Sequence, residues 1–272
     1  MFQGKSVVVT GGSSGIGLAT ACAFASRGAH IALVARDPEK LERARLTVEA
    51  ACLSDSQRVM TVSADLSRLE SARAAIERVL ASGVDIDILV NSAGTIIPGV
   101  FETMNSEEFL RNVEHGFLSV VWPCKAVVPH MVARGNGHIV NVSSVAGFLG
   151  IYGYSGYSAS KFATMGFTEA LRFEMKPAGV QVHVVCPPDT DTPALDHEKT
   201  LRPPETDAIA GGIKAIPPSQ VAEAIVRGVS RGKYYIIPDA LSRFYFRLKG
   251  LLPEVFFMIV DGDIAKVRRV GK

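Results

Sequence analysis

The chain has 272 residues, of which 47% are apolar, and its formal net charge at pH 7 is +2. This length and apolar content suffice for the core of one large α/β domain. The near-neutral charge argues against a nucleic-acid-binding protein, which needs a strongly basic face. The four cysteines lie far apart, and neither they nor the six histidines have the spacing of metal ligands. We therefore expect reduced thiols and no metal site.

The elements predicted up to residue 190 alternate between short β-branched runs and longer helical patterns. Strands are predicted over 6–10, 30–34, 59–63, 87–90, 137–142 and 180–186, and helices over 15–27, 38–52, 67–81, 106–133 and 156–176. This alternation predicts a doubly wound parallel sheet, a Rossmann fold in a single α/β domain covering residues 1–272. Ligands of such a sheet bind at the carboxyl ends of its strands.

The composition changes after residue 187. Residues 189–218 are polar and proline-rich and predict a long lid loop, which at this length is usually functional. A helix over 219–231 and a strand over 234–237 follow. The hydrophobic tail, residues 240–272, has apolar runs with basic residues between them. Such a tail is typical of an interfacial membrane helix, of an oligomer interface or of a cover over a substrate pocket, and its charges exclude a clean bilayer span.

The strand predicted at 6–10 leads directly into a glycine-rich turn, Thr10-Gly11-Gly12-Ser13-Ser14-Gly15-Ile16-Gly17, and then into a helix. Glycines let the backbone approach a pyrophosphate, and the helix N-terminus offers it free N–H groups. A turn of this kind in this position indicates a dinucleotide site.

Arg36 at the end of the second predicted strand favours NADPH over NADH, because a guanidinium suits a ribose 2′-phosphate. Asp37 weakens this preference, because sites that prefer NAD have an acidic residue here that accepts a hydrogen bond from the ribose 2′-hydroxyl. However, Asp37-Pro38 is also a natural helix start.

Ser144, Tyr157 and Lys161 are the candidate catalytic residues. Tyr157 and Lys161 lie one helical turn apart and therefore on one helix face. A nearby cation lowers the pKa of a tyrosine, which would make Tyr157 a usable general acid. Ser144 follows the strand predicted at 137–142, where it can reach the same site and hold a substrate oxygen.

With these motifs the chain resembles the short-chain dehydrogenase/reductases over its whole length. The shared features are the glycine turn, Asp65, Asn91-Ser92-Ala93-Gly94, Ser144 and Tyr157-x-x-x-Lys161. The resemblance implies hydride transfer between a nicotinamide and a carbonyl carbon, with Tyr157 as acid, Ser144 orienting the oxygen, and Lys161 assisting Tyr157 and holding the ribose. The residues expected to bind the cofactor are Gly11, Ser13, Ser14, Gly15, Ile16, Gly17, Arg36, Asp65, Leu66, Asn91, Ala93, Gly94, Tyr157, Lys161, Pro187, Thr190 and Thr192.

One position departs from the family pattern. The family usually has an asparagine thirteen residues before a helical proline, where it kinks the helix and anchors a water on the proton route to the lysine. Counting back from Pro129 leads to Gly116. A glycine also permits a kink, but it lacks the amide, and nothing shows that Asn112 or His115 replaces it. Restoring asparagine at position 116 is expected to raise turnover if the amide is limiting.

The run Pro187-Pro188-Asp189-Thr190-Asp191-Thr192-Pro193 is similar to that of 3-ketodihydrosphingosine reductases, which reduce 3-dehydrosphinganine with NADPH. The expected function is thus NADPH-dependent reduction of a long-chain 3-keto lipid. Two alternatives stay open: an NADP(H)-dependent dehydrogenase of a steroid or other bulky alcohol or ketone, and a non-catalytic dinucleotide-sensing protein. We expect a cytoplasmic homo-oligomer, a dimer or tetramer, whose tail is the candidate for peripheral membrane contact.

Overall fold

Parallel strands form a single sheet in the computed structural model, which describes residues 2–210 and 214–270. The strand order is β3-β2-β1-β4-β5-β6-β7, and all neighbours are parallel. The strands are β1 (Ser6–Thr10), β2 (His30–Ala35), β3 (Val59–Ser63), β4 (Ile88–Asn91), β5 (Gly137–Val142), β6 (Val180–Val185) and β7 (Tyr235–Ile236). Each predicted strand is confirmed to within two residues at either end.

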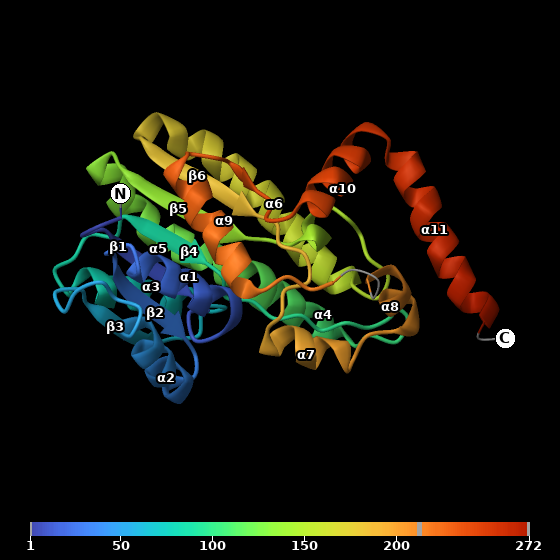
Figure 1. The fold of residues 1–272 in the computed structure, drawn as a ribbon, viewed down its shortest axis with the longest axis horizontal. Helices are drawn as coiled ribbons and strands as arrows, with labels where there is room; N and C mark the ends of the chain where they lie inside the picture. Colours follow the sequence, from blue (N-terminus) through green and yellow to red (C-terminus); the bar gives the residue numbers. More distant parts are fainter. Residues whose placement is uncertain (1, 211–213, 271–272) are drawn as a thin grey trace.

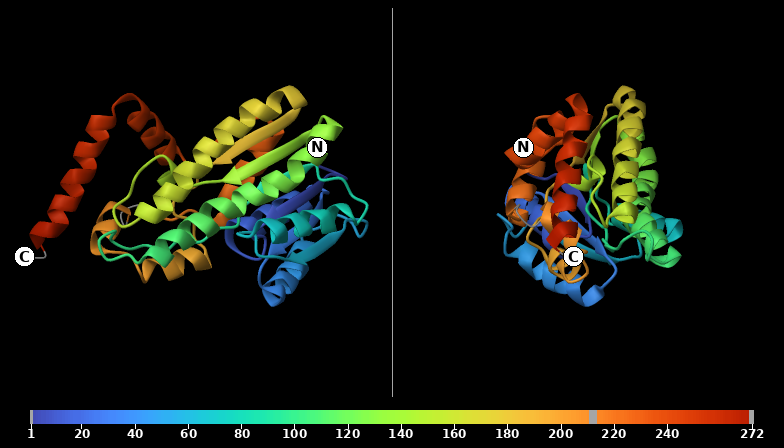
Figure 2. Two further views of the ribbon diagram at one scale, coloured as in Figure 1. Left: turned by 180° about the vertical axis from the view of Figure 1, so that it is seen from behind. Right: turned by 90° about the vertical axis from the view of Figure 1, so that its right-hand side faces the viewer.

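Helices cover both faces of this sheet, because alternate side chains of each strand point to opposite faces and both sets are apolar. Val7 and Val9 pack toward α1, α2 and α9, whereas Val8 packs toward α3, α5 and α6. Figure 1 shows the first layer, and the left view of Figure 2 shows the opposite one. The helices are α1 (Gly15–Ala25), α2 (Pro38–Glu49), α3 (Leu69–Leu80), α4 (Ser106–Val113), α5 (Ser119–Arg134), α6 (Ser155–Met175), α7 (Pro193–Lys199), α8 (Pro204–Ala210), α9 (Pro218–Ser230), α10 (Ala240–Leu251) and α11 (Pro253–Val270). The predicted doubly wound fold is confirmed.

The strand order reverses at β1, which pairs with β2 on one side and β4 on the other. Connections from these two neighbours leave in opposite directions, and this opens a crevice at the carboxyl ends of the strands. The glycine turn after β1 and the residues after β4 and β5 all meet at this edge. The sheet thus brings the separate sequence motifs together.

The helix predicted over 106–133 is present but interrupted. A π-helical turn, Glu114–Leu118, separates α4 from α5. By length and composition alone the stretch Ser106–Arg134 could span a membrane. However, Val120, Cys124, Val127 and Met131 are buried in the core between α3, α6 and the sheet, so this is a core helix of the domain.

The lid and the tail are more ordered than their sequences predict. The segment expected to be a loop contains α7 and α8, and a parallel bridge between Thr190 and Ile216 closes it. The tail folds into α10 and α11, at the end of the molecule opposite the N-terminus (Figure 1). The unstructured lid was therefore a wrong prediction, because proline at the first position starts a helix as readily as it ends one. Residues 211–213 of the lid and 271–272 of the tail lie outside the described residues.

Candidate active site

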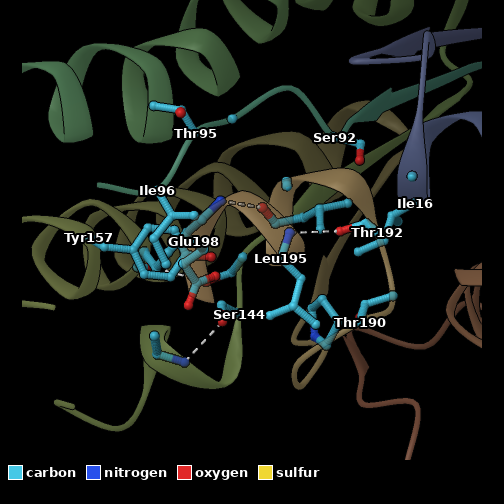
Figure 3. A pocket seen from close by; sticks show the side chains of 18 of the residues that line it. Ile16, Ser92, Thr95, Ile96, Ser144, Tyr157, Thr190, Thr192, Leu195 and Glu198 are labelled. Atoms are coloured by element: carbon cyan, nitrogen blue, oxygen red, sulfur yellow. Dashed lines mark hydrogen bonds between the residues drawn. The ribbon is translucent and has the colours of Figure 1, made fainter. Parts of the chain in front are cut away.

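A cavity of about 510 Å³ lies at the crevice where the strand order reverses. One end is lined by the glycine turn and by residues after β2 and β3, and the middle by Ser144, Tyr157 and Lys161. The lid closes one side, and α10 and α11 close the other. Figure 3 shows side chains of the glycine turn, of the segment after β4, of the lid, and Ser144 and Tyr157 around the cavity. The cavity therefore runs from the glycine turn past the candidate catalytic residues to the lid and the tail.

The glycine turn has the features of a phosphate cradle. Gly11 and Gly15 have positive φ angles of 64° and 53°, which favour glycine. A Cβ at Gly17 would lie 2.3 Å from the carbonyl oxygen of Gly11, so the turn closes only without a side chain there. No side chain caps the first turn of α1, and its N–H groups therefore remain available to a phosphate. The residues present fit a dinucleotide.

Two cationic side chains lie at the end of the cavity where the adenosine ribose of the cofactor is expected. Arg36 and Lys40 line the cavity, and Arg36 makes no ion pair within the described residues. Asp37 instead caps α2, where one carboxylate oxygen accepts from the N–H groups of Glu39 and Lys40, both at 3.0 Å. Asp37 is thus engaged as a helix cap, as the alternative reading of Asp37-Pro38 predicts.

Asp65, Leu66, Ala93 and Gly94 line the cavity as expected, but Asn91 does not. The Asn91 side chain is buried between strands and donates to Asn141 Oδ1 at 2.9 Å and to Cys124 Sγ at 3.2 Å. Asn91 is the last residue of β4, and its side chain points into the helix layer of α5 instead of the crevice. The side chain holds β4 to β5 beneath the site, and a cofactor contact at Asn91 stays a prediction.

The three candidate catalytic residues come together from two elements. Ser144 ends the segment after β5, and its Oγ accepts from the Ala146 N–H at 3.1 Å, which leaves its hydroxyl proton free to point elsewhere. Tyr157 and Lys161 lie one turn apart near the start of α6, and the Lys161 Nζ is 5.6 Å from the centre of the Tyr157 ring. Lys161 is buried and donates to the Val142 carbonyl at 3.2 Å.

Burial dominates the protonation of these groups. It raises the pKa of Tyr157 above its ordinary value, the nearby carboxylates of Glu198 and Asp189 raise it further, and contact with Ser144 opposes both. Burial also lowers the pKa of Lys161 to about 8. The expected lowering of the tyrosine pKa by Lys161 is therefore not seen in the protein alone, and Tyr157 holds its proton at neutral pH, as a general acid must.

The lid contacts the glycine turn through Thr192. A Cβ on Gly15 would lie 3.0 Å from Thr192 Cγ2. Thr192 Oγ1 accepts from the Leu195 N–H at 3.3 Å and so caps α7 (Figure 3). Thr190 donates to the Pro188 carbonyl at 2.9 Å, and both threonines and Pro187 line the cavity. The double proline therefore directs the chain from β6 across the phosphate turn.

Comparison with known proteins agrees with this geometry. Residues 5–202 match the family model for short chain dehydrogenases. The chain belongs to the short-chain dehydrogenase family. As a member of it, the protein is an NAD(P)-dependent oxidoreductase, and a nicotinamide dinucleotide is its cofactor.

Relatives of this short-chain dehydrogenase include sphingolipid enzymes. It is 41% identical to a 3-dehydrosphinganine reductase of Danio rerio over 86% of this chain and 70% of the relative. It is 35% identical to a 3-ketodihydrosphingosine reductase of Dictyostelium discoideum over 99% and 85%, respectively. A short-chain dehydrogenase of Sphingobium yanoikuyae in complex with NADPH superposes with a TM-score of 0.77 at 29% identity, covering 93% of this chain and 94% of the other. A Burkholderia phymatum member in complex with NAD has a TM-score of 0.83 at 25% identity, covering 93% and 95%.

Gly116, the departure from the family pattern, lies within the π-helical turn between α4 and α5. A Cβ at this position would lie 2.5 Å from Ser160 Oγ and 3.0 Å from Ser160 Cβ. Asn112 does not replace the missing amide, because both ends of its side chain bond to the backbone of Ile97 at 3.0 Å. The glycine lets α6 approach the turn closely, with Ser160 occupying the space that a side chain would need.

Sequence reasoning missed a polar cluster on the lid side of the cavity. Glu198 of α7 is buried and lines the cavity together with Tyr154 and Asp189, and Arg202 lies behind them. The four-residue spacing of Glu198 and Arg202 was the available signal. On a polar segment that spacing usually indicates a solvent-exposed ion pair, so it did not predict a buried one. The tail residues Leu241, Tyr245, Phe256, Ile259 and Val260, which also line the cavity, were expected there only as one of three alternatives.

Proposed function

We propose that this short-chain dehydrogenase reduces a long-chain 3-ketone with NADPH, and that 3-dehydrosphinganine is its substrate. The observation that carries this proposal is the apolar wall beyond Tyr157. Phe256, which is 6% exposed, and Tyr245 stand edge to face with ring centres 6.2 Å apart, and both line the cavity with Ile259 and Val260. Such a wall stabilises an alkyl chain by about 0.8 kcal/mol for each buried methylene. The relatives named as 3-dehydrosphinganine reductases support the same substrate.

The protein's own residues then have defined roles. Tyr157 donates its phenolic proton to the carbonyl oxygen, and the Ser144 hydroxyl donates a hydrogen bond that orients this oxygen. Lys161 donates to the Val142 carbonyl, and its ammonium group stabilises the negative charge of the phenolate as it forms. The glycine turn, Asp65 and Gly94 would hold the nicotinamide dinucleotide, which supplies a hydride when bound. Of these three residues Lys161 is buried, at 5% exposure, whereas Ser144 and Tyr157 are partly exposed on the cavity wall, where a substrate can reach them.

The first test measures NADPH oxidation with 3-dehydrosphinganine, a steroid ketone and a small cyclic ketone. Turnover should be greatest with 3-dehydrosphinganine and vanish in Tyr157→Phe. Tyr152→Phe is the matched control, because Tyr152 does not line the cavity. Preference for the steroid would favour the alternative of a bulky-alcohol dehydrogenase. Cofactor binding without turnover of any ketone would favour the dinucleotide sensor.

The preference for NADPH rests on Arg36 and Lys40, two cations at one end of the cavity. A guanidinium beside a 2′-phosphate forms charge-assisted hydrogen bonds that NADH cannot make. Arg36→Ala should therefore weaken NADPH binding by about 10- to 100-fold and NADH binding much less. Arg43→Ala, on α2 but outside the cavity, is the control. Equal losses for both cofactors would contradict the 2′-phosphate assignment.

The tail is proposed to bring this cytoplasmic enzyme to a membrane surface that holds its lipid substrate. Phe244, Leu251 and Met258 are 57%, 79% and 74% exposed. Next to α10, a hollow on the surface is lined by basic residues of α9, of the turn that follows it and of α10: Arg227, Arg231, Lys233, Arg243 and Arg247. Exposed apolar groups beside a basic patch are typical of binding to anionic lipid.

Vesicle sedimentation tests this contact. The protein should bind vesicles containing anionic lipid more strongly than neutral ones, and Arg243→Glu with Arg247→Glu should abolish the difference. If the same apolar residues instead cover a second copy of the chain, sedimentation in solution will show the dimer or tetramer expected from the sequence, and vesicle binding will be absent.

A further inference from the structure

Glu198 is a buried carboxylate that the mechanism above does not use. It belongs to α7, it is 5% exposed, and it lines the cavity. Its exposed neighbour on the same helix, Asp196, does not line the cavity. A buried carboxylate is unfavourable unless it is paired, so its partners show what it can still bind.

The partners of Glu198 leave one of its two oxygens open. Oε1 accepts from the Tyr154 hydroxyl and from Arg202 Nε, the latter at 2.6 Å. Arg202, whose side chain is 2% exposed, also donates to Asp189 Oδ2 at 2.7 Å. Within the described part of the chain Oε2 has no hydrogen-bond partner. A carboxylate oxygen can accept two hydrogen bonds, and Glu198 lines the cavity.

The charges of the cluster do not balance. Two carboxylates, Glu198 and Asp189, face one guanidinium, Arg202, and the more exposed Asp207 adds negative charge 3.9 Å from the same guanidinium. Lys161, the cation nearest to the reacting centre, donates to the Val142 carbonyl on another wall. The cluster therefore has more acidic than basic side chains; burial raises the pKa of the Glu198 carboxyl, and a bound cation would offset the excess of carboxylates.

The cluster lies next to the reacting centre. The ring of Tyr154, which donates to Glu198, stands edge to face with the ring of Tyr157 at 5.8 Å between centres. Both Glu198 and Asp189 are close enough to raise the pKa of Tyr157. In Figure 3, Tyr157, Glu198 and Ser144 point into the same part of the cavity. A substrate whose carbonyl oxygen meets Tyr157 and Ser144 would thus place its adjacent carbon near Glu198.

We propose that Glu198 Oε2 binds the ammonium group of an α-amino ketone substrate. The inference rests on the proposed function, because 3-dehydrosphinganine carries an ammonium group on the carbon next to its ketone. It adds a recognition rule: the enzyme selects ketones with a free, charged α-amino group over ketones whose nitrogen is acylated or absent. A charge-assisted hydrogen bond of this kind corresponds to about 10- to 100-fold in kcat/KM.

The test compares three ketones of equal chain length: 3-dehydrosphinganine, its N-acetyl derivative, and the analogue that lacks the nitrogen. The wild-type enzyme should prefer the free amine over the analogue without nitrogen by about tenfold or more in kcat/KM. In Glu198→Gln this ratio should fall toward one, in Glu198→Asp it should fall less, and in Asp196→Asn it should not change. The wild-type ratio needs no variant, so it tests the inference even if Glu198→Gln does not fold.

The outcomes separate the two proposals. If Glu198→Gln slows all three ketones equally and leaves the ratio unchanged, Glu198 only supports the lid and the inference is wrong. If the wild type reduces 3-dehydrosphinganine with no preference for its amine, the inference fails while the proposed function stands. If the wild type reduces none of the three, the proposed function itself fails.

Discussion

A side chain at position 116 should damage both stability and turnover, because the structure leaves no room for it. The Cβ of Gly116→Ala would lie 2.5 Å from Ser160 Oγ and 3.0 Å from Ser160 Cβ. Ser160 precedes Lys161 on α6, and its hydroxyl donates to the Tyr157 carbonyl at 2.7 Å. The turn of α6 that would have to move is thus the turn that positions both catalytic side chains.

The magnitude follows from two opposing effects. Forcing a methyl group into a packed core costs about 1–3 kcal/mol, and replacing glycine by alanine in a helix returns at most about 1 kcal/mol. Gly116→Ala should therefore destabilise the fold by about 0–3 kcal/mol. Ser160→Gly removes both contacting atoms, so the clash should disappear in the double variant. The coupling between the two positions should then be about 1–3 kcal/mol.

Urea unfolding of the wild type, the two single variants and the double variant measures this coupling, and steady-state kinetics of the same four proteins should follow it. An asparagine at position 116 would meet the same two atoms of Ser160. Gly116→Asn alone should lower turnover, and any gain from the restored amide should be seen only with Ser160→Gly. Single-variant effects that add within about 0.5 kcal/mol, or full activity in Gly116→Asn alone, would refute the steric argument.

Three further predictions concern separate parts of the molecule. Burial lowers the pKa of Lys161 from 10.5 to about 8, so between these pH values the unfolded state binds more protons than the folded state. From pH 7.5 to 10 the unfolding free energy of the wild type should therefore rise by up to about 3 kcal/mol relative to that of Lys161→Met. Urea titrations of both proteins measure this, and a difference between their unfolding free energies that does not change with pH would contradict it. Asp87 accepts from the Ser6 N–H, Lys5 and Arg134, and these contacts hold its pKa below the ordinary 3.8. Asp87→Asn should lower the unfolding free energy by about 1–3 kcal/mol at pH 7. A carboxylate whose pKa is lowered by folding stabilises the fold fully only above the pKa that it has in the unfolded chain, so this loss should shrink as the pH falls below about 4. Phe256→Ala should reduce kcat/KM for an eighteen-carbon ketone much more than for a six-carbon ketone; equal losses would mean that the alkyl chain lies elsewhere.

The sheet and most of the site could be predicted from the sequence because their signals are local. Buried parallel strands are continuous β-branched runs, the glycine turn is contiguous, and Tyr157 and Lys161 share one helical turn. The carboxyl ends of parallel strands meet at one edge, so Ser144 could be placed beside them without a structure.

The lid and tail could not be predicted in the same way, because their positions depend on contacts far apart in the sequence. Glu198 and Arg202 have the spacing of an ordinary surface pair, and only packing against Tyr154 buries them. The buried position of the Asn91 side chain could not be predicted either, because the direction of a side chain at a strand end depends on local geometry. The close contact of Gly116 with Ser160 joins two helices and leaves no trace in either sequence segment.

NADPH oxidation in the presence of 3-dehydrosphinganine tests the proposed activity most directly. The wild-type enzyme should consume NADPH and form the corresponding 3-hydroxy product, and Tyr157→Phe should bind NADPH normally but form none. Reduction of 3-dehydrosphinganine by Tyr157→Phe at the wild-type rate, or no reduction by a wild-type enzyme that binds NADPH, would contradict it.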